Sequence, residues 1–376
     1  MGNYSVKLQD QEISSKYNYL IRKTIISSGN KKTPLLGKSY PYTDFNNTKH
    51  INEVYVKTST SKLKDINNNK DLEEQWKTEL NDKIRKNPNT FNLPLVKIPY
   101  DNLLKRNLNM VLETLVDEIY LNPNIDIIIP PIIEFPDNDS NSMNQLKIYE
   151  NMINGLYNVT ESTVKNNKIA FFLPHYLPRS RIADLLDFYV KQFGSDSLIV
   201  IDINGLFEKA APTVFFIMRK LNLLKEESFG LYAFNQRSNK KSGISVPSQD
   251  FLAYSNGISY IGPSHIQSKQ PKGVLQSQKS EYKIFNGDDL LYYPLASGYP
   301  SDSFNNWIGN KQASYWNVKR YNSKNIETKT NNLLSFSNTD DFFNSINRDT
   351  FLNSLNQISK KRNKSLKLGS LNDFIK

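Results

Sequence analysis

The sequence contains no cysteine among its 376 residues. Without thiols the chain has no disulfide, no cysteine-ligated zinc or iron–sulfur centre, and no cysteine nucleophile. Histidine is also scarce: His50, His175 and His265 are the three in the chain, so a histidine-rich metal site is not expected. We therefore expect no metal and no cofactor, and any reaction would depend on the side chains of the chain itself.

Long hydrophobic runs and glycine-rich phosphate motifs are lacking as well. No apolar run approaches the ~18 residues of a membrane-spanning helix, and the amino terminus has no signal-peptide core. We therefore expect a cytoplasmic protein with no membrane partner. Neither G-x-G-x-x-G nor G-x-x-x-x-G-K-[ST] occurs, which argues against a Rossmann dinucleotide site and a Walker NTPase site.

Basic residues are in excess. The chain has 48 Lys and Arg against 37 Asp and Glu, which gives a formal net charge of +11. Such an excess favours an anionic partner or substrate, for example nucleic acid. A proteome rich in Lys and Asn would give the same excess without nucleic acid, so charge leaves both interpretations open.

Six apolar runs alternate with helical patterns in the middle of the chain. The predicted strands are 94–98, 125–129, 168–173, 197–201, 229–234 and 258–261. Pro130 and Pro131 predict that the second strand ends at Ile129, because proline is poorly tolerated in central strands. Strands that alternate with helices form a parallel sheet. We predict an α/β fold, a parallel (β/α) barrel of the TIM type with irregular ends; an open doubly wound sheet is the alternative.

The composition divides the chain into three regions. Residues 1–90 are a polar amino-terminal extension that could contribute a first barrel strand, 91–267 are the (β/α) core, and 268–376 are an aromatic and basic carboxyl-terminal region. In the first region, spacing predicts a helix with Trp76 as its packing anchor. In the last, a helix is expected over 340–359 with Thr339 as its N-cap, followed by a basic tail over 360–367.

Polar side chains follow five of the predicted strands, where each strand ends. They are Glu134 and Asp137; His175, Arg179 and Arg181; Asp202 and Asn204; Asn235, Gln236 and Arg237; and His265. In parallel α/β folds the site lies just past the carboxyl ends of the strands. We therefore predict Asp202, Glu134 and His175 as catalytic residues and the remaining Arg, Asn, Gln and His side chains as substrate-binding residues.

Asp202 is the leading candidate for a nucleophile or base, because a carboxylate directly after apolar strand residues is rigidly placed and partly desolvated. Its alternative role is to cap the helix that begins near Leu206. Glu134 would be the partner carboxylate for glycosyl chemistry. His175 is suited to proton transfer near neutral pH; the alternative is a solvated loop histidine.

Arg179 and Arg181 lie at the start of a predicted helix, where open backbone N–H groups also favour anions. Arginine binds phosphate or carboxylate through two parallel hydrogen bonds, so these residues predict a phosphate site. The alternative is that Arg181 pairs with Asp184 or Asp187.

Two carboxyl-terminal segments suggest partners. The aromatic and basic stretch 304–321 is typical of a stacking platform for single-stranded nucleic acid, or it packs against its own domain. Leu368, Leu371, Phe374 and Ile375 give the end of the chain a spacing that resembles the peptide by which archaeal replication and repair proteins bind their sliding clamp. That resemblance implies a clamp partner; the motif's usual Gln is Leu368 here, and its final aromatic is Ile375.

The function expected from these features is a metal-independent barrel enzyme that acts on an anionic substrate, nucleic acid or a nucleotide, by glycosyl transfer or hydrolysis. A tRNA-guanine transglycosylase barrel is similar by analogy of fold alone, since its zinc cysteines are absent here. The alternative is a non-catalytic protein, associated with nucleic acid or a sliding clamp, on a degenerate barrel.

Overall fold

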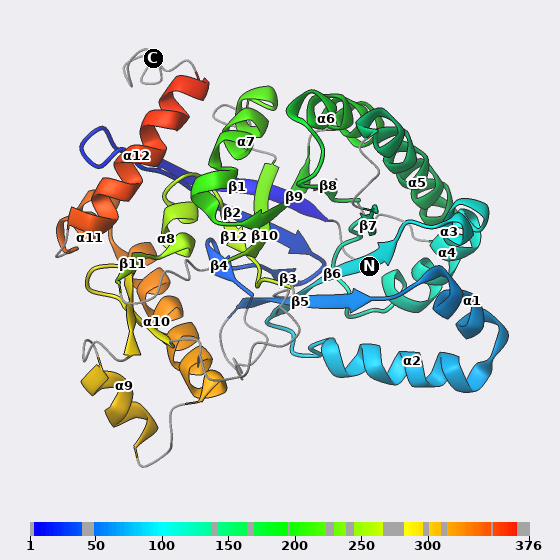
Figure 1. Cartoon of the computed structure of the whole chain (residues 1–376), viewed down its shortest axis with the longest axis horizontal. Helices are drawn as coiled ribbons and strands as arrows, with labels where there is room; N and C mark the ends of the chain where they lie inside the picture. Colours follow the sequence, from blue (N-terminus) through cyan, green and yellow to red (C-terminus); the bar gives the residue numbers. More distant parts are fainter. Residues whose placement is uncertain are drawn as a thin grey trace, which may run out of the picture.

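The computed structural model describes residues 4–39, 49–136, 141–163, 169–194, 196–222, 229–237, 244–265, 282–295, 301–309, 314–346 and 349–366. Its architecture is mixed α/β, which confirms the class predicted from the alternating patterns. The strands gather in the centre and helices surround them (Figure 1). No helix within these ranges combines the length and apolar character needed to cross a membrane.

A five-stranded parallel sheet forms the centre, with strand order β4-β12-β10-β9-β8. Its strands are β4 (Gly37–Lys38), β8 (Phe171–Leu173), β9 (Ser197–Gly205), β10 (Phe229–Gln236) and β12 (Tyr260–Ile261). Nearly every residue of β9 and β10 is buried. Parallel strands covered on both faces require such continuous apolar runs, and this is why the sequence marks them so clearly.

A second parallel sheet has the order β5-β6-β7 and consists of β5 (His50–Lys57), β6 (Thr90–Pro99) and β7 (Ile132–Glu134). Two isolated parallel bridges join the sheets: Ser39 pairs with Ile51, and Ile128 pairs with Ile169. The strands of both sheets therefore run in the same direction, and their carboxyl ends lie at the same end of the molecule.

The strand predicted over 125–129 is wrong in its position. Ile128 contributes an isolated bridge, and the regular strand β7 follows the two prolines. Proline has no N–H group, so Pro130 and Pro131 interrupt the ladder there.

Helices connect the parallel strands. They are α1 (Thr60–Asn68), α2 (Lys70–Lys83), α3 (Asn102–Arg106), α4 (Leu108–Leu115), the π-helix η1 (Val116–Tyr120), α5 (Ser142–Thr163), α6 (Arg179–Phe193), α7 (Phe207–Lys220) and α8 (Gln249–Tyr254). In α6 the buried side chains are Ile182, Leu185, Leu186 and Tyr189, the helical spacing predicted from the sequence. Trp76 is buried on α2, so its role as a packing anchor is confirmed.

An antiparallel unit at the amino terminus lies against the amino ends of β9 and β10. It has the order β1-β2-β3 and comprises β1 (Ser5–Ile13), β2 (Leu20–Ser28) and β3 (Lys31–Lys32). The backbone N–H of Leu198 donates to the Tyr4 hydroxyl at 3.1 Å, and the buried guanidinium of Arg22 donates to the carbonyl of Phe229 at 3.3 Å. Burial lowers the pKa of Arg22 to about 10. This unit covers the end of the central sheet opposite to the strand exits.

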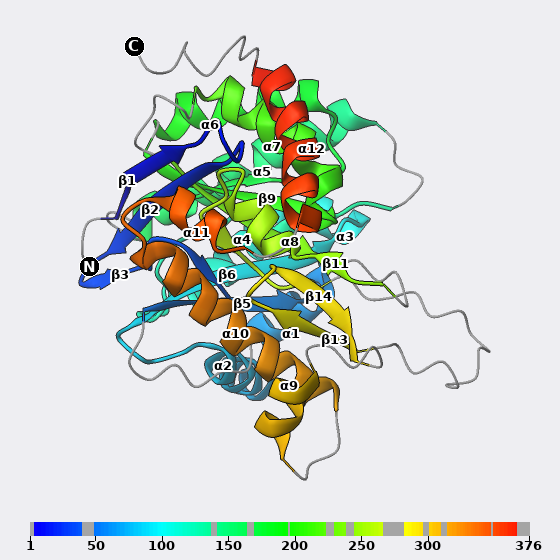
Figure 2. The same cartoon turned by 90° about the vertical axis from the view of Figure 1, so that its left-hand side faces the viewer.

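The described part of the carboxyl-terminal region adds an antiparallel sheet and the helices α9 to α12 (Figure 2). The sheet order is β11-β14-β13, with β11 (Val246–Pro247), β13 (Lys283–Asn286) and β14 (Leu291–Pro294). The helices are α9 (Ser301–Ile308), α10 (Tyr315–Ser335), α11 (Thr339–Asn344) and α12 (Asp349–Leu366).

Two expectations for this region are wrong. The single helix over 340–359 is two helices, and the N-cap of the first is Asn338, whose side chain accepts from the N–H of Asp340. The basic tail expected over 360–367 does not follow the helix as far as residue 366, because residues 360–366 belong to α12. Within it, Arg362 is buried and donates to the carbonyl of Asn18 at 3.0 Å. The clamp-like peptide 368–376 lies outside the described residues.

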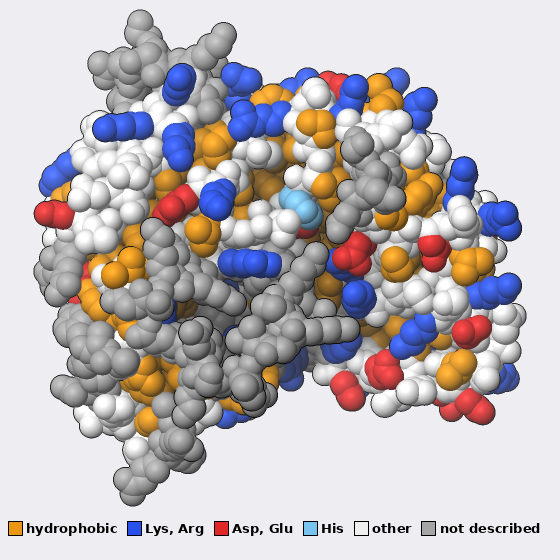
Figure 3. All heavy atoms as spheres, in the orientation of Figure 1, with side chains coloured by type: hydrophobic (Ala, Val, Ile, Leu, Met, Phe, Trp, Pro, Cys, Tyr) orange, Lys and Arg blue, Asp and Glu red, His pale blue; other side chains and the backbone are white. Residues whose placement is uncertain are grey.

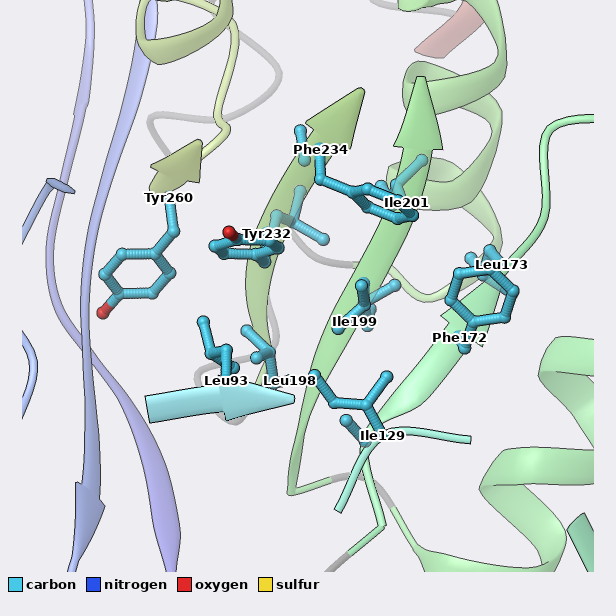
Figure 4. Packing of buried hydrophobic residues seen from close by; sticks show 14 of the residues in the cluster. Leu93, Ile129, Phe172, Leu173, Leu198, Ile199, Ile201, Tyr232, Phe234 and Tyr260 are labelled. Atoms are coloured by element: carbon cyan, nitrogen blue, oxygen red, sulfur yellow. The ribbon is translucent and has the colours of Figure 1, made fainter. Parts of the chain in front are cut away.

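Apolar side chains from the parallel strands of both sheets pack together between them (Figure 4). Leu93 of β6, Phe172 of β8 and Ile199 of β9 are fully buried there. Phe172 and Phe234 lie with ring centroids 6.2 Å apart. The interior is thus filled with apolar side chains, and buried polar groups lie toward both ends of the strands.

Candidate functional site

Asp202 lies near the carboxyl end of β9 and is the most connected of the predicted site residues. Its Oδ2 atom is 2.8 Å from Nδ1 of His175, and its Oδ1 atom accepts from Nδ2 of Asn235 at 2.9 Å and from the N–H of Asn204 at 3.1 Å. The side chain is 6% exposed. Asp202 does not cap α7, whose N-cap is Leu206, so the capping alternative is wrong.

His175 lies just past β8, and its side chain is 37% exposed. Because a carboxylate oxygen accepts hydrogen bonds, the contact with Asp202 requires a proton on Nδ1, and Nε2 is the ring nitrogen outside this contact. The ring also lies edge-on to Tyr176, with centroids 5.4 Å apart. Figure 3 shows a histidine ring exposed on the face drawn there, with Lys and Arg side chains nearby.

Two asparagines turn the chain at the ends of β9 and β10. Asn204 has φ +46° and Asn235 has φ +58°, in the left-handed region that asparagine tolerates better than most residues. In this conformation the Asn235 side chain joins two parts of the site. Its Nδ2 donates to Asp202, and its Oδ1 accepts from the backbone N–H of His265 at 2.9 Å.

A second imidazole–carboxylate pair lies beside the first. Nε2 of His265 contacts Oε1 of Glu53, and the hydroxyl of Tyr232 donates to Oε2 of the same carboxylate. Glu53 belongs to β5, and its side chain is 1% exposed. The ring of Tyr55 stacks on His265 with centroids 3.8 Å apart and planes 4° apart. We call His175, Asp202, Asn235, His265 and Glu53 the two-imidazole cluster.

The Tyr55 phenol shows how much negative charge this end of the sheet carries. Its pKa is raised to about 12, first by burial and then by the charges of Glu134, Glu53 and Asp202. Glu134 therefore lies within electrostatic range of the cluster. Its carboxylate is 44% exposed and pairs with Lys97 at 2.7 Å, and it makes no direct contact with Asp202.

The three arginines predicted as substrate-binding residues lie outside the hydrogen bonds of the two-imidazole cluster. Arg181 pairs with Asp184 at 2.8 Å, so the ion-pair alternative is confirmed for it. Arg179 is exposed at the start of α6. Arg237 follows β10, and its N–H donates to the carbonyl of Gly205 at 2.7 Å. None of these contacts reaches the two-imidazole cluster.

Gln236 belongs to a neighbouring polar group. Its Nε2 donates to Asp250 at 2.8 Å, and Asp250 in turn pairs with Lys38 at 2.5 Å. Asn235 and Gln236, neighbours at the end of β10, therefore belong to two different polar groups. Asp137, also predicted at an exit, lies outside the described residues.

Glu53, Tyr55 and Tyr232 belong to the site, and the sequence did not indicate them. Tyr232 is hidden in an apolar strand, and Glu53 lies in a stretch that is polar overall. The one available signal is the run Val54-Tyr55-Val56, whose β-branched and aromatic residues favour a strand. Within the described ranges, no three His, Asp or Glu side chains converge in a way that could hold a metal ion.

Gly262 gives a direct test of how the Glu53 carboxylate is held. A Cβ atom at this position would overlap Oε2 of Glu53 and lie 2.5 Å from the hydroxyl of Tyr232. We expect Gly262→Ala to lower the free energy of unfolding by about 1–3 kcal/mol, the range typical of overpacking. Chemical denaturation measures this change.

Gly287→Ala is the matched control. Its added Cβ would make only ordinary contacts, 3.5 Å or more, with Lys329. A surface change of this kind should stay within about 0.5 kcal/mol of the wild type. Equal stability of the two variants would contradict the tight packing of Glu53 against Gly262.

The chain was compared with families and with individual proteins. No protein-family model matches the sequence, and no curated protein matches it either. Its function therefore has to be argued from the geometry of the two-imidazole cluster and its surroundings.

Proposed function

We propose that this chain is an enzyme that transfers protons to and from an anionic substrate, nucleic acid or a nucleotide, during hydrolysis or group transfer. The observation that carries the proposal is the pair of imidazole–carboxylate contacts linked through Asn235. A carboxylate that binds one ring nitrogen fixes the orientation and tautomer of the imidazole and leaves the other nitrogen to react. Proton transfer by such a group contributes roughly 10²–10⁴-fold to a rate.

In this proposal the reacting atom is Nε2 of His175, and Asp202 is its positioning residue. The carboxylate of Asp202 is buried and already accepts three hydrogen bonds, which leaves it poorly placed to attack a substrate. Glu134 is the more exposed carboxylate near the cluster. If the bond broken is glycosidic, Glu134 is therefore the available acid.

The fold that we propose for this site is a closed eight-stranded parallel barrel. Each consecutive pair of parallel strands along the chain, from β4 to β12, is joined by a ladder or by an isolated bridge. The last of them, β12, pairs with the first, β4. Closure would bring all the strand exits to one mouth, which is where substrates bind in barrels of this type.

Exposed cations and the exposed indole of Trp316 support a partner that is anionic and has bases able to stack. Trp316, Arg320 and Lys324 are four residues apart on α10, so they share one face of the helix, and all three are exposed. Nζ of Lys319 lies 5.9 Å from the Trp316 ring centroid. By contrast, Tyr321 is buried beside Phe304, so part of the aromatic stretch packs within its own domain.

The activity test uses a panel of mononucleotides and of single- and double-stranded DNA and RNA oligonucleotides, with products separated by mass. The wild type should release a base, a phosphate or a shorter strand from at least one of them. We expect His175→Gln to reduce the rate roughly 10²–10⁴-fold and Asp202→Asn to reduce it as well, with melting curves like that of the wild type.

His50→Gln is the matched control, because His50 lies at the start of β5, where its Nε2 atom is 2.8 Å from the Thr90 hydroxyl. It should keep full activity. A wild type that binds nucleic acid but alters no member of the panel would support the alternative, a non-catalytic binding protein. Full activity of a folded His175→Gln variant would reject the assigned role.

Binding to a labelled single-stranded oligonucleotide, measured by anisotropy over a salt series, tests the partner class. Affinity should fall as salt rises, because bound cations release condensed counterions from the phosphates. Arg320→Gln should reduce the slope of log affinity against log salt concentration by roughly one, because one phosphate contact is lost. Trp316→Ala should weaken the free energy of binding by about 1–3 kcal/mol at every salt concentration.

Lys64→Gln removes the same charge from an exposed position on α1 and serves as the control. It should leave both the affinity and the slope unchanged. An affinity independent of salt, or an equal effect of the two charge changes, would contradict binding on this face of α10.

A further inference from the structure

The two imidazoles of the cluster use different nitrogens to contact their carboxylates. His175 contacts Asp202 through Nδ1, whereas His265 contacts Glu53 through Nε2. The nitrogen left for a substrate is therefore Nε2 in His175 and Nδ1 in His265. Both rings start from the same end of the parallel strands, and Asn235 links them through Asp202 on one side and the His265 backbone on the other.

The two carboxylates differ in how their charge is balanced. Asp202 accepts two amide N–H groups besides the ring of His175, so several neutral donors share its charge. The oxygens of Glu53, almost fully buried, contact a tyrosine hydroxyl and the ring of His265. A buried carboxylate is best balanced by a donor that can carry positive charge, and of these two contacts the ring of His265 is the one that can do so.

We propose that the substrate is a phosphodiester, that His175 is the base and that His265 is the acid of the reaction. The proposal rests on the proposed function of the same cluster. In the step, Nε2 of His175 takes the proton of the attacking O–H group, water or a substrate hydroxyl, and an O–P bond forms. The P–O bond to the leaving oxygen breaks, and the Nδ1 proton of His265 passes to that oxygen.

A phosphodiester fits these groups better than a glycoside does. Displacement at phosphorus needs positioning, charge stabilisation and proton transfer, and it needs no carboxylate nucleophile. Asp202 and Glu53 are buried and bonded through both oxygens, while the imidazoles each keep one nitrogen for reaction. Exposed Arg179, which follows His175 at the start of α6, is a donor suited to phosphate.

Tyr55 and Glu53 act through His265 as positioning residues. The Tyr55 ring lies flat on the imidazole, and the Glu53 carboxylate binds its Nε2 atom. Together they fix the plane of the ring and its rotation within that plane. A proton donor held in this way needs little reorganisation when charge develops on the leaving oxygen.

The loss of cleavage rate depends on the leaving group if the mutated residue is a proton donor, and does not if the residue is structural. A p-nitrophenolate leaves without protonation, whereas the alkoxide of a nucleoside needs a proton. We expect His265→Gln to reduce cleavage of ribo- and deoxyribodinucleoside monophosphates roughly 10²–10⁴-fold and that of bis(p-nitrophenyl) phosphate less than about tenfold. His175→Gln should reduce both alike, and His50→Gln should change neither.

An equal loss on both substrates for a folded His265→Gln variant would give His265 a structural role and overturn the proposal. If that variant does not fold, Glu53→Gln decides, because it preserves the shape of the side chain and should show the same selective loss. A wild type that releases bases from the panel but cleaves no diester would refute this proposal and leave the proposed function standing. No turnover of any substrate would refute both.

Discussion

Two buried carboxylates, Asp202 near the carboxyl end of β9 and Glu53 within β5, determine how this site is built. Neither Asp202 nor Glu53 can lose its partners without leaving a charge in a nonpolar environment, which is costly. Their partners are the two imidazoles, a tyrosine hydroxyl and the amide groups of two asparagines. The orientation of every reacting group therefore follows from where β5 holds Glu53 and where β9 ends.

The rest of the fold fixes the position of those two strands. The interior between the parallel strands is filled with apolar side chains, so polar groups are confined to its two ends. At the amino ends, Tyr4, which precedes β1, and the buried Arg22 of β2 bond to strand residues. The two imidazoles lie at the carboxyl ends, just past β8 and β12. The opposite ends of the same strands thus have separate tasks, one structural and one chemical, as in other parallel α/β folds.

Much of this arrangement could be predicted from the sequence, because β9 and β10 are apolar throughout and end in polar residues. Asp202, His175, Asn204, Asn235 and His265 were all expected at strand exits, and the structure brings them into one hydrogen-bonded group. Glu53 could not be found in this way. Its strand is short of apolar residues, and its carboxylate is buried only because Gly262 and Tyr232, distant in sequence, leave room and a donor for it.

The wrong predictions for the carboxyl-terminal region have a similar cause. The charge run over 360–364 resembles a solvated tail, yet Arg362 is buried by contacts with Asn18 and Asn256, which lie far away in the chain. Local composition cannot show a partner that only the fold supplies. Arg181 is the opposite case: its local partner Asp184, three residues on, was visible in the sequence and is its partner in the structure.

The central claim is that buried carboxylates hold the two imidazoles through different nitrogens. Nitrogen-15 correlation spectra of the histidine rings test it most directly, because the chain has three histidines and single His→Gln variants assign each signal. The account predicts that His175 is protonated at Nδ1 with Nε2 unprotonated, and that His265 is protonated at Nε2. Asp202→Asn should abolish the first preference and Glu53→Gln the second. A wild-type His175 protonated at Nε2, with Nδ1 unprotonated, would contradict the account.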